Sequence, residues 1–301
     1  MKTVACLTGS GTAPELMAEA MYALDAVARV HGFAFDQVHA PFGGVALARL
    51  GQTVPTSTRD AVLGADAVLV AGAEEPALDD VMAELDLRAR VTRVRFGQHD
   101  DVAFVTAVRE DAAEWTLRRA FAIAATRRMR LTCVGDNDWC ELVNLVAPEH
   151  EHVRVEHVSP RDAIPFAAFN PGRFDVVAVA PQWAEGMVEI SAAAAMHRVA
   201  AHALLAEHGP SLFVPSPDGG FALAGHGVVN PSSMLLAAAL TLEHGLGEPA
   251  AAKTLAGAVS QALVDEPVRF GVRASTREFT SRVLGGFQMS MRNAEFWPET
   301  V

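Results

Sequence analysis

The chain has 301 residues, half of them apolar, and a formal net charge of −12 at pH 7. This length and hydrophobicity allow a large core and fit two modest domains better than one. The acidic balance opposes nucleic-acid binding, and no apolar run reaches the roughly 18 residues of a membrane span. Because the first residues also lack the basic start and apolar core of a signal peptide, we expect a cytoplasmic protein.

Strand-length apolar runs alternate with helical patterns along the chain. The predicted strands are residues 2–7, 67–71, 91–96, 102–108, 130–134, 153–158 and 175–180. A helix is predicted over 14–30, which opens with Pro-Glu and closes near Gly32, and another over 249–263. The alanine-rich segments 191–205 and 232–243 predict helices that pack on several sides. This alternation predicts an α/β protein with much parallel sheet.

Three cysteines are spread along the sequence. Cys6, Cys133 and Cys140 are odd in number and do not have the spacing of metal ligands. We therefore expect buried thiols and no disulfide framework.

Segment 224–247 combines a glycine-rich loop, an Asn-Pro pair and a helix of unusual composition. Pro231 suits the first turn of a helix, and Asn230 before it can act as the cap. Gly225 and Gly227 let the backbone approach a ligand closely. His226 could contact an adenine or a phosphate, or be an ordinary surface side chain. Gly225, His226, Gly227 and Asn230 are the candidate cofactor-binding residues.

Five segments in order carry a family resemblance. They are LTGSGTAPE (7–15), DAVLVAGAEEP (66–76), WTLRRAFAIAATRR (115–128) with the strand after it, NPGRFDVVAVAPQWAEGMVE (170–189), and 224–247. Together they resemble the isocitrate and isopropylmalate dehydrogenases, the β-decarboxylating 2-hydroxyacid dehydrogenases. The resemblance implies an α/β, isopropylmalate-dehydrogenase-like two-domain fold with a large mixed, mostly parallel sheet. It places a nucleotide-binding-type domain at 1–98 plus 210–301 and a middle domain at 99–209.

The same resemblance implies a small carboxylic acid as substrate, NAD or NADP as cofactor, Mg²⁺ or Mn²⁺, and a homodimer. In the family, a lysine and a tyrosine manage the proton transfers. The only lysines here are Lys2 and Lys253, and the only tyrosine is Tyr22, none of them in a segment that matches the catalytic positions. Asp136 stands at the place of the family's lysine, so Asp136 and Asp138 are the candidate acid–base groups.

The connection between residues 102 and 115 is short. It leaves no room for the clasp hairpin on which the family displays its tyrosine, so part of the dimer interface is expected to be missing. Arg109 and Glu110 resemble the arginine-glutamate pair at the root of that arm. Arg93, Arg95 and Arg109 could bind substrate carboxylates, since a guanidinium fork matches a carboxylate. The alternative is three exposed arginines at strand ends.

Glu185 and Glu189 stand where the family has two metal-binding aspartates. On a helix their four-residue spacing places both carboxylates on one face, where they repel unless a cation intervenes. A divalent metal site is one interpretation, and a solvated acidic face is the other. The position of the partner-subunit aspartate is Arg161, which could bind substrate or neutralise the two glutamates, while Asp162 beside it could replace the aspartate.

The nucleotide side also departs from the family. Glu74 and Glu75 replace paired glycines, Pro14 stands where a Rossmann fingerprint needs its third glycine, and residues 217–222 lack the family's histidine and aspartate. The sequence therefore predicts a divergent relative of the NAD(P)-dependent enzymes. The alternatives are a repurposed non-redox lyase, decarboxylase or isomerase, and a pseudo-enzyme that binds a metabolite or partner.

Overall fold

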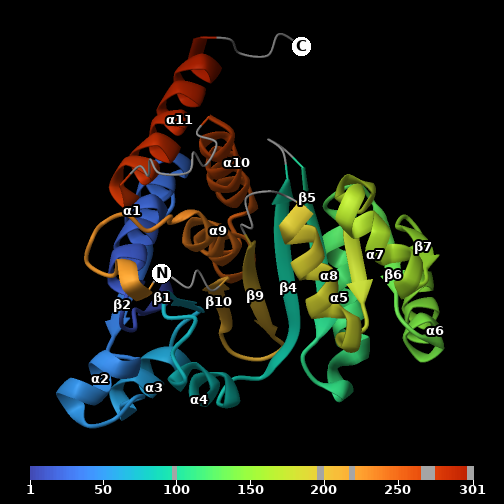
Figure 1. Cartoon of the computed structure of the whole chain (residues 1–301), viewed down its shortest axis with the longest axis horizontal. Helices are drawn as coiled ribbons and strands as arrows, with labels where there is room; N and C mark the ends of the chain where they lie inside the picture. The colour runs from blue at the N-terminus through green and yellow to red at the C-terminus, as the bar shows by residue number, and fades with distance from the viewer. Residues whose placement is uncertain (97–99, 195–199, 217–220, 266–274, 297–301) are drawn as a thin grey trace. The chain divides into compact units, whose positions relative to one another are not determined.

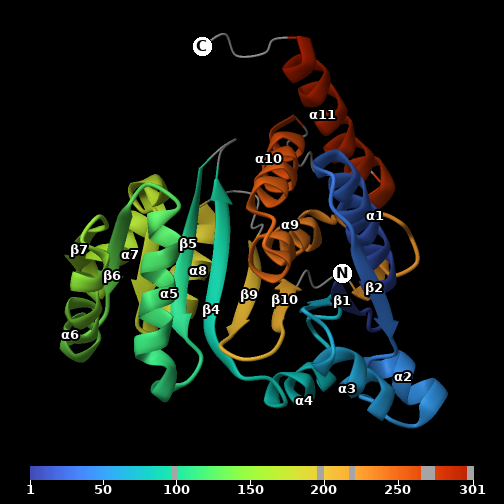
Figure 2. The same ribbon diagram turned by 180° about the vertical axis from the view of Figure 1, so that it is seen from behind.

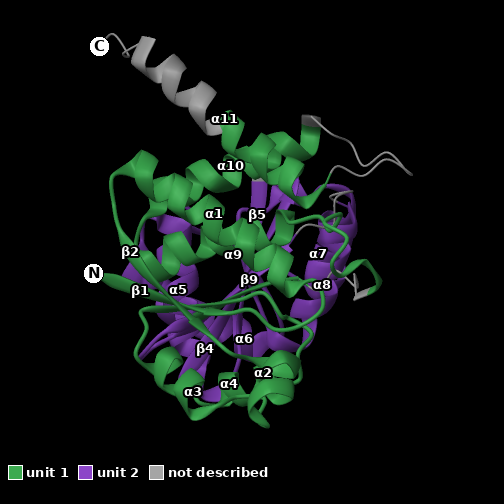
Figure 3. Cartoon of the chain, turned by 90° about the vertical axis from the view of Figure 1, so that its left-hand side faces the viewer, with its two compact units in different colours: residues 1–84, 212–301 green, residues 85–211 purple. Residues whose placement is uncertain are grey.

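The computed structural model (Figure 1, and from behind in Figure 2) describes residues 1–96, 100–194, 200–216, 221–265 and 275–296. The chain divides into two compact units, which Figure 3 colours separately. Unit 1 contains both chain ends, residues 1–84 and 212–301, and unit 2 is the segment 85–211. Over the ranges just given, none of the helices combines the length and the apolar character that crossing a bilayer requires.

The described residues of unit 1 form four strands in the order β2-β1-β3-β10, with β1 parallel to both β2 and β3. The strands are β1 (Lys2–Leu7), β2 (Phe35–Ala40), β3 (Ala67–Val70) and β10 (Ser211–Pro215). The helices are α1 (Ala13–His31), α2 (Gly43–Leu50), α3 (Thr56–Leu63), α4 (Ala77–Ala83), η4 (Phe221–Leu223), α9 (Ser232–Leu240), η5 (Thr241–Leu246), α10 (Pro249–Asp265) and α11 (Thr276–Phe296).

Helices α1, α9, α10 and α11 of unit 1 pack against one another. In α9 every residue except Ser233 is buried, which confirms the predicted packing on several sides. A helix surrounded by other elements can be apolar all round, as this alanine- and leucine-rich sequence is. Helix α1 starts at Ala13 and ends at a left-handed Gly32 with φ 73°, so its predicted start and stop signals are confirmed.

In the part of unit 2 that the structure describes, six strands lie in the order β9-β4-β5-β8-β6-β7. They are β4 (Leu87–Phe96), β5 (Asp100–Ala107), β6 (Arg130–Val134), β7 (Arg154–Val158), β8 (Val176–Val179) and β9 (Ala200–Ala206). The helices are η1 (Glu110–Ala112), α5 (Ala113–Ala125), α6 (Asn137–Val146), η2 (Ala147–His150), α7 (Pro160–Phe169), η3 (Pro171–Arg173) and α8 (Pro181–Ala194). Figures 1 and 2 show α7 and α8 on one face of these strands and α5 on the other.

The strand directions in unit 2 distinguish two ends of the sheet. The end at which the parallel strands finish is called the carboxyl edge, and the end at which they start is called the amino edge. Strands β5, β8, β6 and β7 run parallel, whereas β4 is antiparallel to β5 and to β9. The start of β4 therefore lies at the carboxyl end of β5, where residue Ala89 pairs with Ala107. Open α/β sheets bind ligands outside the carboxyl ends of their parallel strands, so a binding site is expected at the carboxyl edge.

The mixed, mostly parallel α/β architecture and all seven predicted strands are confirmed. The helix predicted over 191–205 is wrong, because α8 ends at Ala194 and β9 occupies Ala200–Ala206. Strands β2, β9 and β10 have no counterpart in the sequence prediction. In β9 all residues but His202 are buried, and burial on both faces replaces the polar alternation that marks a strand.

The connection from β5 to α5 contains no hairpin. Strand β5 ends at Ala107, a single 3₁₀ turn follows, and α5 starts at Ala113. The predicted absence of the clasp from this connection is confirmed.

Candidate functional site

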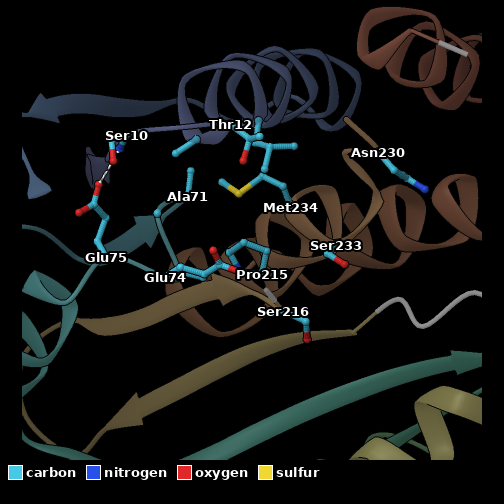
Figure 4. Close-up of a pocket in the computed structure, with 14 residues that line it drawn as sticks. Ser10, Thr12, Ala71, Glu74, Glu75, Pro215, Ser216, Asn230, Ser233 and Met234 are labelled. Carbon is cyan, nitrogen blue, oxygen red and sulfur yellow. Dashed lines mark hydrogen bonds between the residues drawn. The ribbon is translucent and has the colours of Figure 1, made fainter. Parts of the chain in front are cut away.

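A small cavity in unit 1 lies between the loops after β1, β3 and β10 and the start of α9 (Figure 4). Its volume of about 40 Å³ is enough to enclose a group of a few atoms. The polar residues that line it are Ser10, Thr12, Glu74, Glu75, Ser216, Asn230 and Ser233. Three segments of the family resemblance therefore meet at one place.

Glu75 points away from the middle of this cavity and into a cradle of glycines. Its Oε1 accepts hydrogen bonds from the amide (2.8 Å) and the hydroxyl of Ser10, as the dashed line in Figure 4 marks, and its Oε2 accepts one from the amide of Gly44 at 3.1 Å. A Cβ on Gly43 would lie 2.3 Å from Cδ of Glu75, and one on Gly72 would lie 2.9 Å from its Cγ. The carboxylate thus occupies amide donors that could otherwise hold an anionic ligand.

The loop before α9 is held in place by unit 1 itself. The Gly225 amide donates to the carboxylate of Glu15, and the Thr276 amide donates to the carbonyl of Gly227 at 2.8 Å. Gly225 and Gly227 have φ of 79° and 63°, a backbone region that favours glycine. Of the four predicted cofactor residues only Asn230 lines the cavity, whereas Gly225, exposed His226 and Gly227 do not.

The predicted cap of α9, Asn230, lies one residue before the cap position, which Pro231 occupies without a capping side-chain hydrogen bond. The Oδ1 of Asn230 accepts a hydrogen bond from the amide of Ser232 at 2.9 Å, two residues ahead. This bond satisfies one of the amides that a helix leaves open at its start. Segment 217–220, part of the run without the family's histidine and aspartate, lies outside the described residues.

In unit 2, Asp136 sits directly after β6 and caps α6. Its Oδ1 accepts from the amide of Trp139 at 3.1 Å and its Oδ2 from Nε2 of Gln182 at 2.9 Å. Both oxygens therefore have a structural use. Asp138 is exposed in the first turn of α6, and its carboxylate makes no hydrogen bond or ion pair with another described residue.

Arg109 lies at the carboxyl end of β5, beside an arginine that the sequence analysis did not single out. The Nε and Nη2 of Arg109 donate hydrogen bonds to the Oδ1 and Oδ2 of Asp111, at 3.0 and 2.8 Å. This bidentate bond raises the pKa of Arg109 and lowers the pKa of Asp111. Nη1 of Arg109 also reaches Asp86 at 3.4 Å, and the same carboxylate lies 3.2 Å from Nε of Arg88.

Arg88 is therefore a candidate carboxylate-binding residue that was missed. It also pairs with Glu207, which follows β9, at 3.0 Å. The signal that could have revealed it is the antiparallel register of β4 and β5, in which the Val108 amide donates to the Arg88 carbonyl at 2.8 Å. A sequence pattern does not give the direction of a strand, so it could not bring Arg88 next to Arg109.

Arg93 and Arg95 lie near the other end of β4, at the amino ends of the parallel strands. Nε of Arg93 is 2.8 Å from Oδ2 of buried Asp101. Arg127 binds the same carboxylate at 3.1 Å and Asp175, whose side chain is 1% exposed, at 2.8 Å. The fold thus places Arg93 in a buried ion cluster and does not bring Arg93 or Arg95 to Arg109.

The electrostatics of Asp101 follow from that cluster. Burial acts to raise the pKa of its carboxyl, but the charges of Arg93, Arg127 and Arg95 and a hydrogen bond from Arg127 outweigh burial. The net result is a pKa lowered to about 2. Asp101 is therefore ionised in the neutral range.

Glu185 and Glu189 lie on the exposed side of α8, which starts at the carboxyl end of β8. Neither carboxylate has a hydrogen bond or ion pair with another side chain that the structure describes, and exposed Arg161 pairs with neither. Asp162 is used otherwise at the start of α7, because its amide donates to the Oγ of Ser159 and its Oδ2 accepts from that hydroxyl at 2.7 Å.

The lysines and the tyrosine lie away from the candidate groups. Nζ of Lys2 donates to the carbonyl of Leu246 at 2.7 Å, which ties β1 to the end of η5. The Tyr22 ring lies 3.9 Å from the guanidinium carbon of Arg277, and Lys253 is exposed on α10. None of the three lines the cavity of unit 1.

The model of the isocitrate/isopropylmalate dehydrogenase family matches residues 88–283, and the chain belongs to this family. It is 27% identical to a 3-isopropylmalate dehydrogenase of Streptococcus thermophilus (strain CNRZ 1066), over 94% of this chain and 99% of that protein. It is 29% identical to a 3-isopropylmalate dehydrogenase of Synechococcus sp. (strain CC9605), over 86% of this chain and 90% of that protein.

Two solved structures share the fold. One is the apo form of a β-decarboxylating dehydrogenase from Thermococcus kodakarensis, with a TM-score of 0.85, 20% identity and full coverage of both chains. The other is an isocitrate dehydrogenase from Methylococcus capsulatus, with a TM-score of 0.78 and 19% identity over 95% of this chain and 99% of that one.

Proposed function

We propose that this chain is an NAD(P)-dependent oxidoreductase of its family that acts on a small 2-hydroxy carboxylic acid. One observation carries the proposal: the carboxyl edge of unit 2 gathers the chemistry such a substrate needs. In the strand order β4-β5-β8-β6, this edge presents Arg88 with Arg109, then the start of α8, then Asp136. The nearly full-length likeness to proteins named 3-isopropylmalate dehydrogenase supports the same reaction class.

Arg109 is the proposed anchor of the substrate carboxylate. Its side chain is 45% exposed, and its bidentate partner Asp111 is 64% exposed. A substrate carboxylate has the same fork geometry as Asp111 and can take its place. Arg88, held by Asp86 and Glu207, would support the bound acid from the adjacent strand.

The residues of α8 fit a divalent metal of the hard, oxygen-binding kind. Glu185 and Glu189 are four residues apart on an exposed side, and Mg²⁺ usually keeps several waters while one or two carboxylates hold it. Such an ion would polarise the oxygen of a 2-hydroxy or 2-keto acid. For the proton transfers we propose Asp138, because its carboxylate is exposed while both oxygens of Asp136 are engaged.

The cavity of unit 1 fits an uncharged part of a nucleotide better than a phosphate. Thr12, Asn230 and Ser233 offer hydroxyl and amide groups, whereas Glu74 is acidic and Glu75 occupies the amides of the adjacent loop. We therefore assign Thr12, Asn230 and Ser233 to a ribose or an amide of the cofactor. The phosphates would have to bind outside this cavity.

Binding and turnover test the proposal together. We expect NAD⁺ or NADP⁺ to bind in calorimetry, and a panel of small 2-hydroxy acids with Mg²⁺ or Mn²⁺ to produce absorbance of the reduced nicotinamide. Arg109→Met should raise KM for the acid by about 100-fold, the scale of a lost charge-assisted pair. Arg59→Met, which removes an exposed ion pair with Glu84 in unit 1, serves as the matched control. Failure of both nucleotides to bind would eliminate a nicotinamide-dependent reaction.

A repurposed lyase, decarboxylase or isomerase is the second candidate. It is favoured by Glu75, whose carboxylate accepts hydrogen bonds from loop amides that could otherwise bind a nucleotide. Replacing Glu74 and Glu75 together by glycine restores the paired glycines of the family in the loop after β3. If the double variant binds a nicotinamide nucleotide and the parent chain does not, the parent is a non-redox member. Release of CO₂ from a β-keto acid by the parent without nucleotide would then identify the reaction, whereas carboxylate binding without turnover would indicate a pseudo-enzyme.

We also propose a homodimer formed through α7 and α8. These helices pack on each other and expose Phe169 and Trp183, whose accessible fractions are 89% and 41%. Large apolar side chains exposed on neighbouring elements are typical of subunit interfaces. Light scattering on the purified chain tests the mass, and Phe169→Glu should shift it towards the monomer.

A further inference from the structure

Two thiols and an imidazole meet at the β6, β7 and α6 corner of unit 2. Cys133 on β6 and His157 on β7 are register partners in a parallel pair, which places their side chains on one face of the sheet. Cys140 lies on α6, and its Sγ is 3.3 Å from Sγ of Cys133. One ligand atom from each of the three residues lies within 4.8 Å of the others.

We propose that Cys133, Cys140 and His157 form a binding site for a thiophilic divalent cation, Zn²⁺, with water as the fourth ligand. Tetrahedral Zn²⁺ with these donors requires ligand atoms separated by about 3.5–3.8 Å, from bond lengths near 2.3 Å to sulfur and 2.0–2.1 Å to nitrogen. The sulfur separation in the structure is 3.3 Å, so a small side-chain movement admits the ion. Two ligands come from rigid strands, which pre-organises the site.

The donor set selects the ion. Thiolates with an imidazole favour Zn²⁺, whereas Mg²⁺ and Mn²⁺ prefer the oxygen ligands of the proposed α8 site. This cation site is therefore independent of the proposed dehydrogenase activity. The linear sequence conceals it, because six residues separate the cysteines and the histidine comes from the next strand.

Burial favours the protonated form of the Cys133 thiol when no ion is bound. Cys133 is fully buried, and burial together with the hydrogen bond to Cys140 raises the pKa of its thiol far above the usual value. A cation that enters displaces the thiol protons, so binding is expected to weaken as pH falls. His157 is exposed and gives the ion its path, and the contact of its Nε2 with Asn144 Oδ1 at 3.0 Å orients the ring.

The site would stabilise the turn that presents the candidate acid–base residues. Gly135 and Asp136 lie between the two cysteines, and the Cys140 amide donates to the Asp136 carbonyl at 3.0 Å. An ion bound to both sulfurs would join β6 to the start of α6 across this turn. Its expected role is therefore structural.

Cobalt substitution tests the site on the reduced full-length chain after treatment with a chelator. We expect a thiolate charge-transfer band in the near ultraviolet that saturates at one Co²⁺ per chain and disappears when Zn²⁺ displaces the Co²⁺. Zn²⁺ should raise the melting temperature by several degrees. Cys140→Ser and His157→Ala should each lower Zn²⁺ affinity at least about 100-fold, and exposed His157 gives a variant expected to fold.

The matched control is His208→Gln, which alters the other described group with ligand spacing, Asp86, Glu207 and His208. It should bind Co²⁺ with an unchanged spectrum. The proposal is overturned if the parent chain shows no charge-transfer band, if Cys140→Ser binds as the parent does, or if Cys133 and Cys140 form a disulfide under the reducing conditions of the titration.

Discussion

The two edges of the sheet in unit 2 both carry arginine–aspartate pairs, yet burial gives them different uses. At the amino edge the side chains of Arg127, Asp101 and Asp175 are 12%, 11% and 1% exposed. At the carboxyl edge those of Arg109 and Asp111 are 45% and 64% exposed. A buried pair cannot lose one partner without leaving an unpaired charge, whereas an exposed pair can exchange its partner for a ligand. The same residue types thus serve the fold at one edge and recognition at the other.

Arg127→Met gives the largest expected effect. It leaves Asp101 and Asp175 buried with fewer charge partners, and breaking a buried ion pair costs about 3–5 kcal/mol of unfolding free energy. Urea denaturation measures the loss. Arg109→Met is the matched change at the carboxyl edge and should leave the denaturation midpoint almost unchanged. Equal shifts in the two variants would contradict the distinction between the edges.

Acid titration probes the interior of the sheet between the two edges. His202 of β9 pairs with Thr92 of β4, where Oγ1 and Nδ1 are 2.9 Å apart. Burial, helped by the charge of Arg90, lowers the pKa of His202 from 6.5 to about 4. The unfolded chain therefore takes up the proton first, so stability present above pH 6.5 is lost as pH falls towards 4. The loss amounts to about 3 kcal/mol.

Unfolding free energies measured at several pH values between 7 and 4 test this expectation. His202→Gln keeps a hydrogen-bonding side chain but cannot titrate, so its stability should change much less over that range. Exposed His208→Gln should keep the slope of the parent. A parent chain with no slope would show that His202 is not held in its neutral form.

A second loss of stability, at lower pH, is expected from Asp101 at the amino edge. The folded pKa of Asp101 is lowered from 3.8 to about 2, so its stabilisation is complete above pH 4 and disappears as pH falls from 4 towards 2. The loss is about 2 kcal/mol. Asp101→Asn should remove this pH-dependent loss at the cost of lower stability at pH 7. If the variant retains the full slope between pH 4 and 2, another carboxyl controls acid unfolding.

The sequence revealed the strands and helices whose signals are local. Strand β6 and helix α1 have clear apolar runs and turn residues at their ends, and the five family segments named the fold. Strand β9 escaped because an alanine- and leucine-rich run suits a helix and a buried strand equally well. Its identity depends on antiparallel pairing with β4, which no local pattern contains.

The candidate site was only partly readable for the same reason. The order of the predicted elements along the chain was enough to place three of the candidate residues. Asp136 follows strand β6, Glu185 lies in the helix after β8, and Asn230 precedes helix α9. The neighbours of Arg109 could not be predicted in this way. Antiparallel pairing brings Arg88 next to Arg109, where both contact Asp86, and brings Glu207 to Arg88. Arg93 looked equivalent to Arg109 in the sequence, but the fold places it at the opposite end of β4 and pairs it with buried Asp101.

Asp111→Asn sharpens the contrast between the edges with the smallest expected effect. The substitution removes the carboxylate that holds Arg109 bidentately and leaves the guanidinium to an incoming anion. If the carboxyl edge is an exchange site, a small dicarboxylate should bind about tenfold more tightly to this variant than to the parent chain. Calorimetry at constant ionic strength measures the change, and Asp60→Asn in unit 1 controls for the altered net charge. Unchanged affinity would mean that Asp111 does not compete with the ligand, and Arg109 would then be as structural as Arg127.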